Sequence, residues 1–314
     1  MVISIIIPSK DRAAILSESL DKAYKAIANI PGEIIVVNDS KTEDIFIRPE
    51  WTDKVKVFNN PKSGVASARN LGAHNASAEL LLFMDDDMWL SSNNVKDIIS
   101  LHQRFARKVC VNLNWVYPPA LAKQLKNTQF GRYLNYFGFD SLEGWRRGAL
   151  WSSTELFAVE GITSQNLSIK KADFINAGGY NENFPHAGFE DYDFSKRLNA
   201  AGIQPYIYPL SLMYHNEADR MEVKSWLDRK KRGGETRRVA VEMGNPELAY
   251  PYGFLKSTIY RGLIKLEPLL FKCVASIPNL PIFDPLYFKI VNTLLGTAFF
   301  AGYQYSGRNT THAN

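Results

Sequence analysis

The chain has 314 residues, of which 46% are hydrophobic, 22% charged and 12% aromatic. This composition is ordinary for a globular protein and excludes disorder, collagen-like repeats and low complexity as the main state of the chain. The two cysteines, Cys110 and Cys273, are too few for a disulfide scaffold or a cysteine-rich zinc site, and they fit a reducing cytoplasmic compartment. The apolar run at 2–7 is too short for a signal peptide, so none is expected.

The formal net charge of +5 is unevenly distributed along the chain. Residues 1–219 carry 23 Lys and Arg against 25 Asp and Glu, a balance of −2, whereas residues 220–314 carry 14 against 7, a balance of +7. A basic C-terminal third indicates an anionic partner. Nucleic acid, an anionic membrane and a diphosphate substrate are the alternatives, beside a merely solvated basic face.

Short apolar runs alternate with helical patterns in the first half of the chain. The apolar runs predict buried strands at 2–7, 33–38 and 79–84, and an alternating pattern predicts a strand nearer an edge at 54–58. Helices are predicted between them at 12–28 and 64–75. This alternation is typical of βαβ units, so the expected fold is α/β, with a mostly parallel sheet flanked by helices.

The later part of the chain gives weaker patterns. Helices are predicted at 92–104 and 189–201, and strands at 109–116, 161–170 and 204–208. The segment 120–158 holds aromatic, glycine and arginine residues without a clear period, and it is interpreted as a long variable segment.

Polar residues follow three of the expected strands, at the point where each strand ends. They are Pro8-Ser9, Asn38-Asp39 and Asp85-Asp86-Asp87. Ligands of open parallel sheets bind beyond the carboxyl ends of the strands, so these residues are expected to share one site.

The acidic triplet is the strongest local signal. In extended chain, residues two apart point to the same side, so Asp85 and Asp87 are expected to converge while Asp86 faces away. Two close carboxylates repel unless a cation lies between them, and Mg²⁺ or Mn²⁺ takes oxygen ligands and bridges to phosphate oxygens. The alternative is an acidic loop of solvated side chains.

Four further residues are candidates with simpler alternatives. Asp39 can accept from a base N–H or a ribose hydroxyl, or it can form an Asx turn. Arg69 can reach a phosphate or brace the acidic triplet, or it can be a surface cation. One of the carboxylates in Glu190-Asp191-Tyr192-Asp193 can be a general base, or they can serve only as favourable charge at a helix start. His215 beside two carboxylates would favour Mn²⁺ over Mg²⁺, and the alternative is that this lone histidine, like most, is not a metal ligand.

Six motifs in order make the chain resemble the family 2 glycosyltransferases of the GT-A fold. The resemblance covers about residues 2–217 and rests on SIIIPSKDR (4–12), EIIVVNDS (33–40), GVASARNLGAHNA (64–76), ELLLFMDDDM (79–88), SQNLSIKKADFINAGGYNENF (164–184) and FEDYDFSKRLNAAG (189–202). It implies a Rossmann-like central sheet with a C-terminal helical extension.

The resemblance also implies roles for matching positions. Contacts to the nucleotide donor are implied for Pro8, Ser9, Asp39, Arg69 and Asp86. Metal ligation is implied for Asp85, Asp87 and His215, the first two lying in the place of the D-x-D signature. In the Glu190-Asp191 pair, the Asp is the implied catalytic base.

The implied reaction is a metal-dependent, inverting sugar transfer. The donor is a nucleoside-diphosphate sugar, with a UDP-sugar expected, and the acceptor is a hydroxyl of a glycan or a lipid-linked molecule, in surface polysaccharide synthesis. A sugar-phosphate nucleotidyltransferase is the first alternative, although the residues 8–12 lack the Gly-rich loop of that class. The second is a non-catalytic carbohydrate-binding or membrane scaffold protein. No nucleic-acid partner is expected.

The chain is expected to divide into a catalytic domain at 1–219 and a basic, helical region at 220–314. Residues 220–238 are interpreted as a flap hinged at Gly233-Gly234, as a contact for anionic lipids, or as a solvated helix. Residues 254–277 predict an amphipathic helix, and 286–303 form an 18-residue stretch with one charge. We expect these helices to lie on the cytoplasmic face of a membrane. A packed subdomain, a partner surface in a homo-oligomer and a membrane span are the alternatives.

Overall fold

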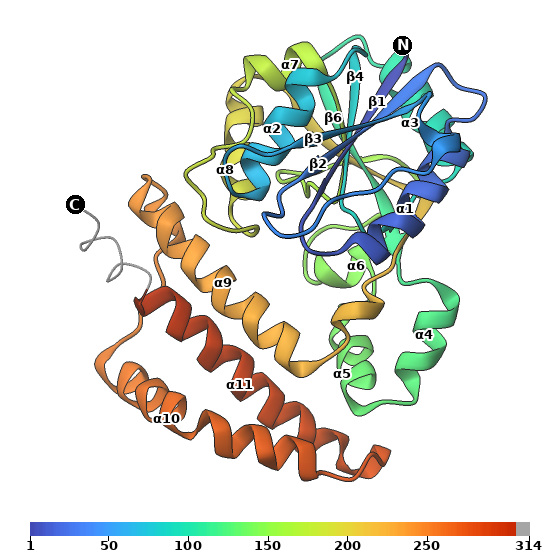
Figure 1. Cartoon of the computed structure of the whole chain (residues 1–314). Helices are drawn as coiled ribbons and strands as arrows, with labels where there is room; N and C mark the ends of the chain where they lie inside the picture. The colour runs from blue at the N-terminus through green and yellow to red at the C-terminus, as the bar shows by residue number, and fades with distance from the viewer. Residues whose placement is uncertain (306–314) are drawn as a thin grey trace. The chain divides into compact units, whose positions relative to one another are not determined.

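The structure, a computed structural model, describes residues 1–305 and divides into two compact units (Figure 1). The sheet unit comprises 1–118, 140–183 and 190–217, and the described part of the helical unit comprises 119–139, 184–189 and 218–305. The expected division after residue 219 stays a prediction about domains. On that side the helical unit begins at Ala218, two residues earlier than expected, and it also takes in two earlier segments. Residues 306–314 of the expected C-terminal region lie outside the described residues.

Within residues 1–305, nine strands form one sheet in the order β3-β2-β1-β4-β8-β6-β9-β5, with β7 paired to β9. Their bounds are β1 Ile3–Ser9, β2 Gly32–Asn38, β3 Val55–Asn59, β4 Leu80–Met84, β5 Met88–Trp89, β6 Val109–Val116, β7 Phe157–Ala158, β8 Asn166–Lys170 and β9 Gln204–His215. The pairs β1–β2, β1–β4, β2–β3 and β6–β9 are parallel, and β8 is antiparallel to β4 and β6. The expected mostly parallel sheet, with the strand at 54–58 at its edge, is confirmed.

Helices of the sheet unit are α1 Ala13–Ala26, α2 Val65–Asn75, α3 Ser92–Arg104, α6 Leu142–Trp145, α7 Lys171–Asn176 and α8 Glu190–Ala200, with a 3₁₀ turn at Pro49–Trp51. The α3 helix starts at a capping box in which the Ser91 side chain accepts from the Asn94 amide. Gly72 lets α2 lie close to β1, because a Cβ atom there would collide with Ile6.

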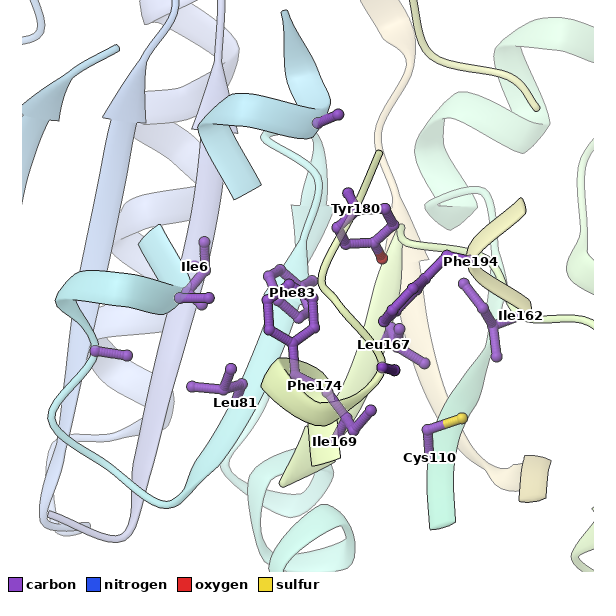
Figure 2. Packing of buried hydrophobic residues seen from close by; sticks show 14 of the residues in the cluster. Ile6, Leu81, Phe83, Cys110, Ile162, Leu167, Ile169, Phe174, Tyr180 and Phe194 are labelled. Atoms are coloured by element: carbon purple, nitrogen blue, oxygen red, sulfur yellow. The ribbon is translucent and has the colours of Figure 1, made fainter. Parts of the chain in front are cut away.

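The core of the sheet unit lies between β1, β4 and β8 and the helices α2, α7 and α8 (Figure 2). The Phe83 ring of β4 lies 4.9 Å from that of Phe174, and the Tyr180 ring lies 4.5 Å from that of Phe194. Burial of such large rings supplies much of the apolar area that stabilises a domain. This cluster fixes α8 against the sheet, and α8 carries the Glu190-Asp191 pair.

The helical unit contains α4 Pro119–Lys126, α5 Gln129–Phe137, α9 Val223–Glu242, α10 Phe254–Ser276 and α11 Asp284–Tyr305, with short 3₁₀ turns at Ala218–Arg220, Pro246–Leu248 and Pro281–Phe283. Figure 1 shows α11 between α9 and α10. None of the helices described here combines the length and apolarity needed to cross a bilayer.

Three expected segments differ in the structure. The variable segment at 120–158 forms α4, α5 and α6, short helices whose apolar faces are completed by packing rather than by a long local period. In the strand expected at 161–170, only β8 is extended, because the amides of Ile162 and Ser164 donate to side chains of α8 instead. The last strand does not end at 208 but runs on to His215, because a bulge carries it past Pro209.

The Gly233-Gly234 pair also behaves differently from expectation. It lies inside α9, which runs unbroken from Val223 to Glu242. A Cβ atom at Gly234 would collide with the carbonyl oxygen of Phe299, and one at Gly302 of α11 would collide with that of Lys231. Gly234 and Gly302 therefore permit a close crossing of α9 and α11, which does not support the expected hinge.

Candidate active site

The residues expected from the sequence gather at one edge of the sheet unit. Ser9 ends β1, Asp39 follows β2, the acidic triplet follows β4, and His215 ends β9. These four strands run in the same direction, so their carboxyl ends share one edge. The edge is the usual ligand-binding position in such sheets.

The acidic triplet forms a turn, which the amide of Met88 closes by donating to the carbonyl of Asp85 at 3.2 Å. Ser9 Oγ donates to Asp86 Oδ2 at 2.7 Å. The Arg12 guanidinium donates both to Asp86 Oδ1 and to Asp87 Oδ2, the latter at 2.9 Å. Asp86 and Asp87 therefore share the Arg12 guanidinium as a hydrogen-bond donor. The expectation that Asp86 faces away is wrong, because the chain turns here instead of staying extended.

Asp85 belongs to a second group of charges centred on Arg69. The Arg69 side chain is buried and donates to Asp85 Oδ1 at 3.1 Å and to Glu190 Oε1 at 3.0 Å. Burial opposes the positive charge, but the surrounding carboxylates outweigh it and raise the pKa of Arg69. Arg69 therefore braces the acidic triplet against α8, the second of the roles suggested by the sequence.

Asp191 lies in the first turn of α8, with its carboxylate in a poorly solvated position. Its Oδ2 accepts from the Ser164 amide at 3.0 Å, and its Oδ1 is buried without a hydrogen-bond partner among the described residues. Burial, reinforced by the neighbouring Glu190 charge, raises the pKa of Asp191 to about 7, against the lowering effects of Arg69 and Ser164. A carboxylate that titrates near neutral pH is suited to accept a proton from a hydroxyl group.

Asp87, His215 and Glu217 form a group of potential metal ligands. His215 Nε2 lies 3.2 Å from Asp87 Oδ1 and 3.8 Å from Glu217 Oε1, and all three side chains are buried. Tyr117 Oη donates to Glu217 Oε2 at 2.9 Å. Two carboxylates and an imidazole within 4.8 Å of one another are a donor set that Mn²⁺ and related divalent cations accept.

This group differs from the expected ligand set in one member. Asp85 is paired with Arg69 and does not belong to the group, whereas Glu217 does. Glu217 follows His215 by two residues, and this spacing is the one local signal in the sequence for its place in the group. Arg12 and Ser164 were also missed, because nothing local marks a residue that contacts a carboxylate far along the chain.

Two of the residues expected to contact a nucleotide, Asp39 and Pro8, make contacts within the sheet unit. Asp39 accepts from the Gly64 amide at 2.9 Å and from Asn60 Nδ2 at 2.6 Å, so it fixes the start of α2. The Asx turn considered for Asp39 is made by Asn38, whose Oδ1 accepts from the Ser40 amide. Pro8 lies in β1, opposite Val37 of β2.

Comparison with known proteins gives two kinds of match. A validoxylamine A glucosyltransferase of Streptomyces hygroscopicus subsp. jinggangensis is 30% identical over 226 residues, which cover 64% of this chain and 52% of that relative. The chain therefore spans about half the length of this curated relative. The mannosyltransferase PcManGT from Pyrobaculum calidifontis, solved with GDP-Man and Mn²⁺, has a TM-score of 0.55 at 15% identity, covering 95% of this chain and 85% of that one.

A second solved structure, GalNAc-T7 with UDP, GalNAc and Mn²⁺, has a TM-score of 0.50 at 15% identity, covering 68% of this chain and 43% of that one. At such identity the likeness establishes the fold alone, and it confirms the expected GT-A arrangement. The sequence also matches the family model described as glycosyltransferase like family 2 over residues 2–240. Because this match covers well over half of the chain, the protein belongs to the glycosyltransferase-like family 2.

Proposed function

We propose that this protein is a metal-dependent, inverting glycosyltransferase. It transfers a sugar from a nucleoside-diphosphate donor, a UDP-sugar, to a hydroxyl group of a glycan or lipid-linked acceptor in surface polysaccharide synthesis. One observation carries the proposal: the sheet unit holds a buried group of potential metal ligands together with a buried carboxylate, Asp191, whose pKa is raised to about 7. The family match supports the reaction class.

The metal would be held by Asp87, His215 and Glu217. The imidazole ligand favours Mn²⁺ over Mg²⁺. Mn²⁺ is the ion in the solved structures of PcManGT and GalNAc-T7, and it is bound there with GDP-Man and with UDP, respectively. When bound, such an ion neutralises the negative charge that develops on the departing diphosphate.

The protein's own residues carry the remaining steps. Asp191 accepts the proton of the acceptor hydroxyl while the oxygen of that hydroxyl forms a bond to the anomeric carbon of the donor sugar. The bond from that carbon to the diphosphate oxygen breaks on the opposite face, so the configuration inverts without a covalent intermediate. Arg69 keeps α8 against the acidic triplet through Glu190 and Asp85, and this holds the base and the donor site in register.

The cations near the strand ends would bind the donor phosphates. The Arg12 guanidinium donates hydrogen bonds to Asp86 and Asp87, and Lys10 Nζ lies 3.8 Å from Asp39 Oδ2. Both can offer N–H donors to phosphate oxygens.

A nucleotide-sugar panel tests this function. The purified protein is mixed with Mn²⁺ and individual UDP- and GDP-sugars, and the unfolding midpoint and the release of nucleoside diphosphate are both measured. We expect one donor to raise the midpoint and to be slowly hydrolysed, since ligands stabilise the state that binds them. Binding with neither hydrolysis nor transfer to added acceptors would indicate the non-catalytic alternative. Binding of no donor would contradict the proposal.

A further inference from the structure

The α10 helix presents two different faces. One face packs along α11 within the helical unit, where the Tyr260 ring stacks on that of Phe300 at 5.1 Å and Val274 is buried. The rest of this 23-residue helix is largely accessible, and Val274 is its single buried residue. Most of the surface of this helix is therefore exposed on the face that does not pack along α11.

The accessible face carries a row of aliphatic side chains, which we call the apolar stripe. It consists of Leu255, Ile259, Leu266 and Leu269, whose exposed fractions are 73%, 53%, 48% and 58%. Their spacings of four, seven and three residues place them on one side of the helix. Exposed aliphatic residues scattered singly are normal, but an aligned row of four marks an interaction surface.

Positive charge lies next to this stripe. Arg261, Lys265 and Lys272 follow one another at spacings of four and seven residues, and all three are exposed. Each lies within one helical turn of a stripe residue, so the cations form a row beside the stripe. In the whole of α10, Glu267 is the one acidic residue against four basic ones.

We propose that α10 docks the helical unit on an anionic lipid surface. The apolar stripe would enter the boundary between headgroups and acyl chains, and Arg261, Lys265 and Lys272 would meet the lipid phosphates. The helix would lie in the plane of the interface. Anionic lipids are abundant in the cytoplasmic leaflet, so the protein is peripheral to the cytoplasmic face of the membrane. This inference does not rest on the proposed sugar transfer.

Charge favours a membrane over a second copy of the chain as the occupant of this face. Two α10 helices packed stripe to stripe would bring two cationic rows to the border of the same interface, and like charges repel there. A bilayer with anionic headgroups instead supplies the opposite charge next to an apolar layer. It therefore complements both rows at once.

The native cysteines provide a direct readout. Cys273 is exposed and lies four residues beyond Leu269, whereas Cys110 is buried in the sheet unit. An environment-sensitive dye on Cys273 is mixed with vesicles of phosphatidylcholine alone or with about a third phosphatidylglycerol. We expect a blue shift of the dye emission, and flotation of the unlabelled protein, with the anionic vesicles. High salt should weaken both in part, since only the electrostatic component is screened.

Two paired substitutions separate the contributions. Ile259→Glu with Leu266→Glu should lower vesicle partitioning by at least about tenfold, because charges replace apolar side chains at the interface. Arg261→Glu with Lys265→Glu should remove the preference for anionic vesicles. The control is Leu210→Glu, at a leucine of β9 that is 58% exposed, which should leave partitioning unchanged. Unchanged unfolding midpoints verify that the variants are folded.

Three results would overturn the proposal. The first is no flotation with anionic vesicles at low salt. The second is normal partitioning of the Ile259→Glu, Leu266→Glu variant. The third is a dye shift that appears without vesicles and grows with protein concentration, which would assign the stripe to a second copy of the chain. None of these measurements uses a nucleotide sugar, so failure here is distinct from failure of the proposed sugar transfer.

Discussion

Replacing Asp191 by asparagine tests the proposed base most directly. The amide keeps the shape of the carboxylate and an oxygen that can accept from the Ser164 amide, but it cannot take up a proton. General-base catalysis typically contributes about 10²–10⁴-fold to a rate. We therefore expect kcat to fall by about a hundredfold or more, while the donor Kd stays close to that of the wild type.

The same substitution has a calculable effect on stability. Burial raises the pKa of Asp191 from 3.8 to about 7, so the folded carboxyl keeps its proton at pH values where the unfolded one has lost it. The folded state then binds more protons between about pH 4 and pH 7, and stability falls as the pH rises through this range. Each pH unit in this range lowers the free energy of unfolding by roughly 1.4 kcal/mol. About two such units lie between pH 5 and the folded pKa of about 7, so the wild type should lose about 3 kcal/mol of stability between about pH 5 and pH 8.

The side chain introduced by Asp191→Asn stays neutral, so this cost is absent from the variant. The difference in free energy of unfolding between the variant and the wild type should therefore shift by about 3 kcal/mol in favour of the variant from about pH 5 to pH 8. Any constant penalty for the new amide cancels in this comparison. Urea unfolding at the two pH values measures the gain. Asp193→Asn is the matched control, since Asp193 lies in the same turn of α8 but pairs with Arg197. The reasoning fails if Asp191→Asn keeps more than about a tenth of wild-type kcat, or if its stability relative to the wild type does not depend on pH.

Three further predictions concern the metal group and the helical unit. Removal of divalent cations with EDTA should abolish transfer and Mn²⁺ should restore it, and full turnover of the true donor in EDTA would refute metal dependence. Glu217→Gln should weaken Mn²⁺ binding, measured calorimetrically without donor, by about 10–100-fold; an unchanged affinity would remove Glu217 from the ligand set. Gly234→Ala should lower the free energy of unfolding by about 1–3 kcal/mol through a clash with α11, whereas Gly233→Ala, which meets open space, should raise it slightly. Equal effects of the two would contradict the close helix crossing.

Local patterns in the sequence determined most of the sheet unit. The helix at 92–104 and the strand at 109–116 have the predicted bounds, since apolar periodicity and the capping residues lie within or directly beside the segments themselves. The edge that carries the site also followed from the sequence, because the residues that end each parallel strand must share one edge. The six ordered motifs were enough to identify the family, which the match over residues 2–240 confirms.

Contacts between distant residues were decided only by the tertiary structure. Arg69 reaches Glu190 across 121 residues and also holds Asp85, while Asp191 meets the Ser164 amide on a different segment. No local pattern encodes such pairs, because each depends on where packing places two separate elements. The contact of Arg12 with both Asp86 and Asp87 likewise joins residues that lie far apart in the sequence.

For the potential metal ligands and for Gly233 and Gly234, the sequence indicated the residue types, and the fold decided which residues come into contact. The sequence singled out Asp85, Asp87 and His215 as expected metal ligands. Only the fold shows that Asp85 pairs with Arg69 and that Glu217, held by Tyr117, joins Asp87 and His215 in a group of potential ligands. Gly233 and Gly234 are indistinguishable in the sequence, yet one faces open space and the other faces α11. Residue types and spacing fix which chemistry is possible, and the packing of distant elements determines which of those residues meet, because burial and close contact are properties of the folded chain.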